Sequence, residues 1–286
     1  MLFAGAFVPT LYAQSNAPGT EPASPLDSLP DPSALIKTVE NNQRQIEAIR
    51  KDYISHRQDE EQEFDSQGRV KSTQIKEYDV YFVGPWEIER LVSKNGKPLS
   101  EDESRKQDDD VRKQEAKARE RIAKREAGED PGKDTITLAK FLAADRFYSL
   151  RHDAYQQREV YAMDFAPRPD FRPHSLVDRL LNALGGTIWI DQQAKQIVRL
   201  EARFLEGVKV GGGLLGAVQK GGNVVLEQRF VNGEVWMPSH GEIHLGARVL
   251  FIHKSIDGNF TFSDYRKFRV DSKILGGAPA VPAPSP

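Results

Sequence analysis

Residues 196–204 read Gln-Ile-Val-Arg-Leu-Glu-Ala-Arg-Phe, and this stretch is the clearest indication of the fold. Its apolar and charged residues alternate: Val198, Leu200, Ala202 and Phe204 are separated by Arg199, Glu201 and Arg203. Successive side chains of a β-strand point to opposite faces of the sheet, so one face of this strand is apolar and the other is solvated. The stretch therefore predicts a strand in a sheet with one buried face.

The same alternation recurs elsewhere in the chain, in residues 161–165 and 243–251, and turn signals separate the runs. Asn232-Gly233 stands between two apolar runs, and Asn-Gly is the strongest short-range hairpin signal. Asp257-Gly258 is expected to make a second hairpin turn. Further strands are expected at 53–64, 70–83, 86–92 and 187–190. Successive hairpins predict a mainly β fold, an antiparallel meander of about ten strands.

Four segments with helical periodicity interrupt the strands. We expect an N-terminal helix capped by Ser33, a second apolar helix over 135–145, and a third over 175–184 that ends at Gly185-Gly186. Residues 101–130 are dense in both charge signs and have few apolar residues, so we expect a solvated helix that projects from the sheet. The three apolar helices are then available to cover the apolar face.

Both ends of the sequence are expected to lie outside the folded unit. Residues 1–15 are uncharged and mostly apolar, which favours a signal peptide-like segment. A signal peptide usually has basic residues before its apolar part, and none is present here, so we expect the true start of the chain to lie upstream. The alternative is the apolar N-terminus of a cytosolic protein. Residues 16–32 are a Pro/Ser-rich linker and 274–286 a disordered Pro/Ala tail. A single domain over 33–273, with the charged insertion 101–130, remains.

Composition excludes several classes of function. There are 40 Lys and Arg against 42 Asp and Glu, a formal net charge of −2, so no nucleic-acid partner is expected. The absence of cysteine excludes disulfides, thiol nucleophiles and iron–sulfur clusters. No transmembrane segment is expected in the mature chain, because no stretch reaches about 18 uncharged apolar residues. Gly211 to Gly216 fits a dinucleotide fingerprint, but its expected neighbours are antiparallel strands, so we predict no cofactor.

Three short runs, 186–191, 197–201 and 235–238, give the chain a family resemblance. Their strand-turn-strand pattern resembles the meander of the periplasmic lipoprotein-carrier superfamily, which includes outer-membrane lipoprotein-sorting proteins and the sensor domains of sigma-factor regulators. The resemblance is clearest over residues 160–270. It implies an open antiparallel half-barrel with helices over its concave face, without catalytic residues, that binds acyl chains or lipidated proteins.

The apolar face of the sheet is the candidate binding surface. The helices are expected either to fill it as an ordinary core or to leave a groove for an apolar ligand. The predicted groove residues are Tyr161, Met163, Phe165, Val198, Leu200, Phe204, Leu226, Phe230, Ile243 and Leu245.

We therefore predict non-enzymatic binding of a lipid or of lipoprotein acyl chains in the periplasm. The alternative is an envelope sensor or scaffold that binds another protein, with the charged insertion as its contact. A lesser alternative is a metal-dependent hydrolase at His240, Glu242 and His244, which lie at every second position of one strand. A polar outer face is the simpler interpretation of these three residues, so no metal site is predicted.

Overall fold

The computed structural model describes residues 28–267, apart from 66, 130–135, 211–215 and 250–251. The signal peptide-like segment, most of the linker and the Pro/Ala tail lie outside the described residues, so these three remain predictions. Among the helices that are described, none has a stretch long and apolar enough to span a membrane.

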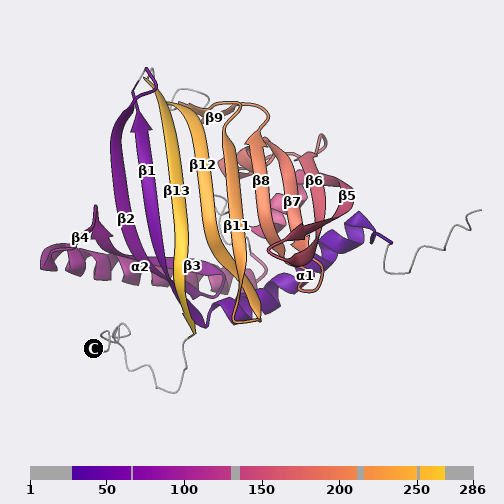
Figure 1. Cartoon of the computed structure of the whole chain (residues 1–286), viewed down its shortest axis with the longest axis horizontal. Helices are drawn as coiled ribbons and strands as arrows, with labels where there is room; N and C mark the ends of the chain where they lie inside the picture. The colour runs from indigo at the N-terminus through magenta and orange to yellow at the C-terminus, as the bar shows by residue number, and fades with distance from the viewer. Residues whose placement is uncertain (1–27, 66, 130–135, 211–215, 250–251, 268–286) are drawn as a thin grey trace, which may run out of the picture.

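One antiparallel sheet organises the described part of the chain (Figure 1). Eleven of its 13 strands follow the order β4-β3-β2-β1-β13-β12-β11-β8-β7-β6-β5, and off this path β10 pairs with β12 and β9 pairs with β10. The strands are β1 (Tyr53–Phe64), β2 (Val70–Val83), β3 (Trp86–Lys94), β4 (Lys97–Pro98), β5 (Asp145–Tyr155), β6 (Arg158–Pro167), β7 (Leu184–Asp191), β8 (Ile197–Phe204), β9 (Val208–Val210), β10 (Gly216–Val218), β11 (Asn223–Val231), β12 (Val235–Val249) and β13 (Ile252–Lys267). The sheet does not close, which confirms the predicted mainly β, open antiparallel fold. It is not a simple meander, because β13 pairs with β1 and joins the two ends of the domain.

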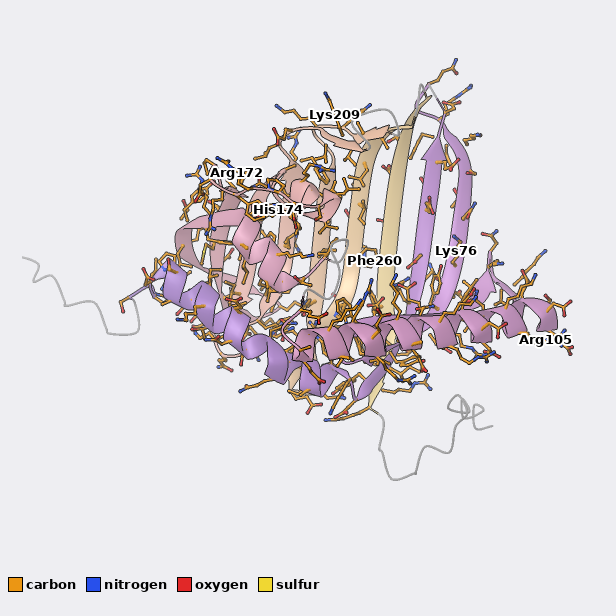
Figure 2. All side chains as sticks on the ribbon, turned by 180° about the vertical axis from the view of Figure 1, so that it is seen from behind. Lys76, Arg105, Arg172, His174, Lys209 and Phe260 are labelled. Carbon is orange, nitrogen blue, oxygen red and sulfur yellow. The ribbon has the colours of Figure 1, made fainter. Side chains whose placement is uncertain are left out.

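Four helices lie on one side of this sheet, behind the strands in Figure 1 and in front of them in Figure 2. They are α1 (Pro32–Arg50), α2 (Glu101–Glu126), α3 (Leu138–Ala144) and α4 (Leu176–Leu181). The cap of α1 is Asp31, whose side chain accepts a hydrogen bond from the backbone N–H of Ala34 at 2.8 Å, so the prediction of Ser33 was wrong. Pro32 fits the first helical position because its fixed φ suits a helix and it needs no partner for an N–H.

Two turn predictions were wrong for the same physical reason. Gly185-Gly186 does not cap α4 but lies inside β7, where a Cβ on Gly186 would be 1.9 Å from the carbonyl oxygen of Glu201. Asp257-Gly258 lies inside β13, which pairs with β12 from His240↔Thr261 to Val249↔Ile252. In both places strand pairing overrides the local turn preference. Asn232-Gly233 does make the predicted hairpin turn, with φ of 50° and 71°.

The sequence led us to expect a charged helix that projects free of the sheet, and this prediction was wrong for α2. It packs along β3, with Val111 and Ala118 buried against Ile88. The side chain of Gln114 accepts from the backbone N–H of Glu89 at 3.0 Å and donates to its carbonyl at 2.9 Å. Gln107 accepts from the N–H of Leu91 at 3.2 Å. The helix thus satisfies backbone groups on the edge of β3 that faces away from β2.

Helices α1, α3 and α4 cover the end of the sheet formed by β5, β6, β7 and β8. The buried core there contains Leu35, Val39, Phe141, Leu142, Met163, Phe165, Val177, Leu181, Ile188, Ile190 and Ala202. Apolar stripes of the short helices meet the apolar faces of these strands, which is the main stabilising contact of this half.

Candidate functional site

Most of the predicted groove residues lie in filled core. Met163 and Phe165 are 0% and 1% exposed under α1, α3 and α4, and Tyr161 and Leu200 pack against the same cluster. Phe204 and Leu245 join a second cluster under Leu176 and Leu180 of α4. In this part of the face the predicted groove residues pack against the helices.

Two of the predicted residues, Val198 and Phe230, belong to a separate cluster around Trp236. The cause is a bulge: Arg199 pairs with Trp189 and Ile197 with Ile190, which leaves Val198 as an extra residue in β8. A bulge breaks the alternation of a strand, so Val198 does not share the cluster of Leu200 as the sequence pattern predicted.

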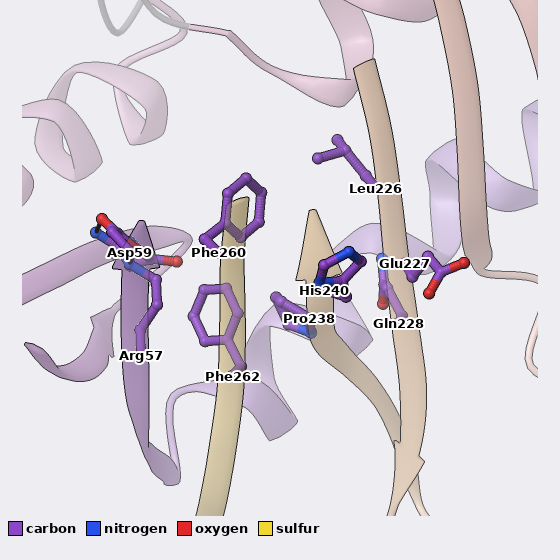
Figure 3. Close-up of a pocket in the computed structure, with 10 residues that line it drawn as sticks. Arg57, Asp59, Leu226, Glu227, Gln228, Pro238, His240, Phe260 and Phe262 are labelled. Atoms are coloured by element: carbon purple, nitrogen blue, oxygen red, sulfur yellow. Dashed lines mark hydrogen bonds and ion pairs between the residues drawn. The ribbon is translucent and has the colours of Figure 1, made fainter. Parts of the chain in front are cut away.

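The predicted residue Leu226 has a different environment, because it is 39% exposed and lines a cavity of about 360 Å³ (Figure 3). Ile243 lies near it on β12, half-buried and paired with Val224. The cavity is lined by Arg57, Asp59, Glu87, Leu226, Glu227, Gln228, Pro238, His240, Phe260 and Phe262. In Figure 2, Phe260 lies above α2, on a part of the sheet that α3 and α4 leave uncovered.

The apolar part of the cavity is built by residues on three neighbouring strands: β11, β12 and β13. Phe260 and Phe262 point to the same face of β13, with ring centroids 6.0 Å apart and the rings nearly perpendicular. Phe260 pairs with Gly241 on β12, and a Cβ at Gly241 would come within 1.9 Å of the phenyl ring. The glycine therefore lets the ring lie across the neighbouring strand. Sequence analysis missed both phenylalanines, although their alternation with Asn259 and Thr261 was a usable signal.

The other end of the cavity is charged and is built around Arg57 of β1. Its Nη1 lies 2.6 Å from Glu87 and 2.9 Å from Glu89, and its Nη2 lies 3.0 Å from Asp59. The guanidinium also stacks 4.7 Å from the ring centroid of Tyr78, and its side chain is 11% exposed. These contacts hold the arginine in one position.

Burial changes the protonation of this charged group. It raises the pKa of Glu87 to about 7, an effect that the nearby Arg57 opposes and the like charge of Glu89 reinforces. Burial also raises the pKa of Asp59. Carboxyl groups with raised pKa values in a cavity are typical of functional sites, because the fold alone gains little from burying them.

The three residues of the hydrolase alternative contact one another on β12. His240 Nε2 lies 3.0 Å and His244 Nε2 3.9 Å from Glu242, and His244 Nδ1 lies 3.0 Å from Asp257. In the part of the chain that the structure describes, no three His, Asp or Glu side chains are arranged to hold a metal ion.

No protein-family model and no curated protein matches the chain. Among solved structures it is similar to an outer-membrane lipoprotein-sorting protein domain from Vibrio parahaemolyticus, with 11% identity and a TM-score of 0.32 over 84% of this chain and 95% of that one. It is also similar to a LolA superfamily protein from Nitrosomonas europaea, with 9% identity and a TM-score of 0.26 over 84% and 97%. A third match is MucB in complex with MucA(peri), with 7% identity and a TM-score of 0.24 over 84% and 100%.

The first two of these structures come from the superfamily that the sequence resembles. At such identities and TM-scores the similarity says nothing about what this chain binds. That information has to come from the residues of the cavity.

Proposed function

We propose that this chain is a non-enzymatic binding protein of the bacterial envelope, exported to the periplasm, which holds an aliphatic chain in the cavity at Leu226 and Phe260. The aliphatic chain would belong to a lipid or to a lipidated protein. The observation that carries the proposal is a cavity of about 360 Å³ with Leu226, Pro238, Phe260 and Phe262 in its wall, beside the part of the sheet that α1, α3 and α4 bury.

The size and the chemistry of the cavity support this ligand. Small-molecule sites usually measure about 300–1,000 Å³ and are mostly apolar, so the cavity accommodates part of a chain and not a whole lipid. Each methylene removed from water contributes roughly 0.8 kcal/mol, and a short chain segment can therefore offset the entropy lost on binding.

The test is calorimetric titration of the purified chain with n-decanol, a neutral aliphatic ligand. We expect saturable binding to the wild type and a loss of at least about tenfold in affinity for Leu226→Glu, because a carboxylate in the wall would be desolvated by the chain. Val70→Glu is the matched control: Val70 is another exposed apolar residue of the sheet, 53% exposed and outside the cavity, and its variant should bind like the wild type.

Absence of decanol binding to a folded wild type would contradict the proposal and leave the envelope sensor or scaffold that binds another protein. Equal binding by Leu226→Glu and Val70→Glu would place the ligand elsewhere. Mass spectrometry of lipids extracted from the native protein gives an independent readout, and N-terminal sequencing of the protein from a periplasmic extract tests the export.

A further inference from the structure

The charged end of the cavity determines which polar group a bound chain can carry. An arginine in an apolar cavity would ordinarily attract a carboxylate or a phosphate. Here most donors of Arg57 already face carboxylates: Nη1 donates to Glu87 and Glu89 and Nη2 donates to Asp59, while Nε lies 2.8 Å from Asp59 Oδ1 without a hydrogen bond. An anionic headgroup would have to displace one of these carboxylates.

The carboxylates themselves face the cavity. Asp59 and Glu87 line it together with Arg57, and their side chains are 31% and 29% exposed, whereas the side chain of Arg57 is 11% exposed. Three carboxylates share this single guanidinium. Burial makes such an excess of negative charge costly and raises the pKa of Glu87 to about 7, and a ligand cation placed beside Asp59 and Glu87 would stabilise their ionised forms.

Two other cations are near this group but do not line the cavity. Lys76 is the cross-strand neighbour of Asp59 on β2. Arg50, at the end of α1, donates to the side chain of Gln228 at 2.8 Å and to the carbonyl of Trp236 at 3.1 Å. At the opposite end, Glu227 is paired with Arg199, and His240 with Glu242. In the wall, Oδ1 of Asp59 is a buried acceptor without a hydrogen-bond partner, and it belongs to the same group of carboxylates around Arg57 as Glu87.

We infer that the cavity selects an aliphatic chain that ends in a cation, an ammonium or a guanidinium group, whose chain lies on Phe260 and Leu226 while its charge lies against Asp59 and Glu87. The inference rests on the proposed function, because it assigns the polar end of the same ligand. An aminolipid and a lysine side chain next to apolar residues of a peptide share this chemistry.

The experiment compares three ligands of equal chain length by calorimetry at neutral pH and below their critical micelle concentrations: n-decanol, n-decylamine and decanoate. We expect decylamine to bind about tenfold or more tightly than decanoate, with decanol between them, because a charge-assisted hydrogen bond contributes about twice as much as a neutral one. A lysine-containing apolar peptide, compared with its norleucine analogue, distinguishes the two natural sources.

Asp59→Asn and Glu60→Gln are a matched pair of variants. Glu60 is the next residue of β1 and points to the opposite face of the sheet, so both variants remove one negative charge but only the first removes it from the cavity. We expect Asp59→Asn to lose most of the preference for decylamine and to bind decanol as before. Glu60→Gln should keep the preference. Glu87→Gln serves as a second cavity variant if Asp59→Asn does not fold.

The outcomes separate the two claims. If decanol binds and decylamine is no tighter than decanoate, the inference is overturned and the proposed function stands. A preference that survives in both Asp59→Asn and Glu87→Gln also overturns it. If none of the three ligands binds the folded wild type, the proposed function itself fails.

Discussion

Two regions of the same sheet face differ in what covers them. On β5–β8, Met163, Phe165 and Ile188 are buried by α1, α3 and α4. On β11, β12, β13, β1 and β3, Leu226 and Phe260 line a cavity that also contains Asp59 and Glu87. The strands of the first region alternate apolar with polar residues, as do Phe260 and Phe262 on β13, whereas β1 is mostly polar. The difference teaches that an alternating strand specifies an apolar face, whereas the helix packed on it decides whether that face becomes core or binding surface.

The helices that pack on the two ends of the sheet also differ in their chemistry. Leu35 and Val39 of α1 and Phe141 of α3 enter the core of the first region. By contrast, α2 contributes Val111 and Ala118 as buried residues and otherwise contacts the sheet through polar groups, such as Arg90–Asp108 and Lys94–Glu103. A polar helix can satisfy a strand edge, but it cannot fill an apolar face.

The largest difference between the two regions is expected for a buried charge. Met163→Glu places a carboxylate where the side chain is 0% exposed, so we expect a loss of more than about 4 kcal/mol in the free energy of unfolding, or no folding at all. Leu226→Glu should cost less than about 1 kcal/mol, because Leu226 is 39% exposed. Urea denaturation of both variants measures the contrast, and a folded Met163→Glu of near wild-type stability would show that the first region is not a filled core.

A smaller effect is expected from Asp145, at the start of β5 in the covered region. Asp145 is 1% exposed, and neither carboxylate oxygen has a hydrogen-bond partner. Burial raises its pKa to about 7, against the opposing charge of Arg168. The native state therefore binds the proton more tightly than the unfolded chain does, and its contribution to stability falls as the pH rises from about 4 to about 7.

Asp145→Asn should remove this fall. Relative to the wild type, we expect the variant to gain on the order of 4 kcal/mol in unfolding free energy between about pH 4 and about pH 8. Asp170→Asn, at a side chain that is 84% exposed, is the control and should show no such gain. A pH-independent difference between Asp145→Asn and wild type would mean that this carboxyl group does not titrate with a raised pKa.

The wall of the cavity can be tested with glycine substitutions. Gly241→Ala should displace the Phe260 ring, since the new Cβ would lie 1.9 Å from it, and we expect a cost of about 1–3 kcal/mol together with weaker decanol binding. Gly258→Ala, on the same pair of strands, meets nothing within 4 Å and should leave decanol affinity unchanged. Equal effects of the two substitutions would show that the ring position does not shape the cavity.

The smallest effect on stability is expected for the polar contact between α2 and β3. Gln114→Ala removes both hydrogen bonds to the backbone of Glu89, and we expect a loss of about 1–2 kcal/mol in thermal or urea unfolding. Lys113→Ala, at the adjacent residue with a side chain that is 76% exposed, should change stability by less than about 0.5 kcal/mol. If the two variants are equally neutral, α2 does not stabilise the edge of β3.

Local patterns in the sequence were sufficient for much of the secondary structure. The expected strands 53–64 and 70–83 have the observed bounds, and Asn232-Gly233 makes its turn. Helices form within the expected ranges 135–145 and 175–184, as α3 and α4, and Thr137 and Ser175 cap them. These features depend on neighbours in the chain, since side-chain alternation, caps and turn conformations are set within a few residues.

The features that failed, or that no pattern predicted, depend on residues far apart in the chain. The bulge at Val198 follows from its pairing with β7, and the extended conformation of Asp257-Gly258 follows from its pairing with β12. Of the predicted groove residues, Leu226 is the one that lines the cavity. The other apolar residues of the cavity wall are brought together by the pairing of β11, β12 and β13.

The sequence by itself therefore determined an open antiparallel sheet with one apolar face and the helices available to cover it. Only the tertiary structure decided that Met163 and Phe165 are core, that Phe260 crosses Gly241 beside Arg57 and Glu87, and that α2 lies on β3. The physical reason is that every half-buried strand shows the same alternation, in which every second side chain faces the core. Whether a helix, a neighbouring ring or a cavity meets that strand depends on contacts between segments that sequence periodicity does not connect.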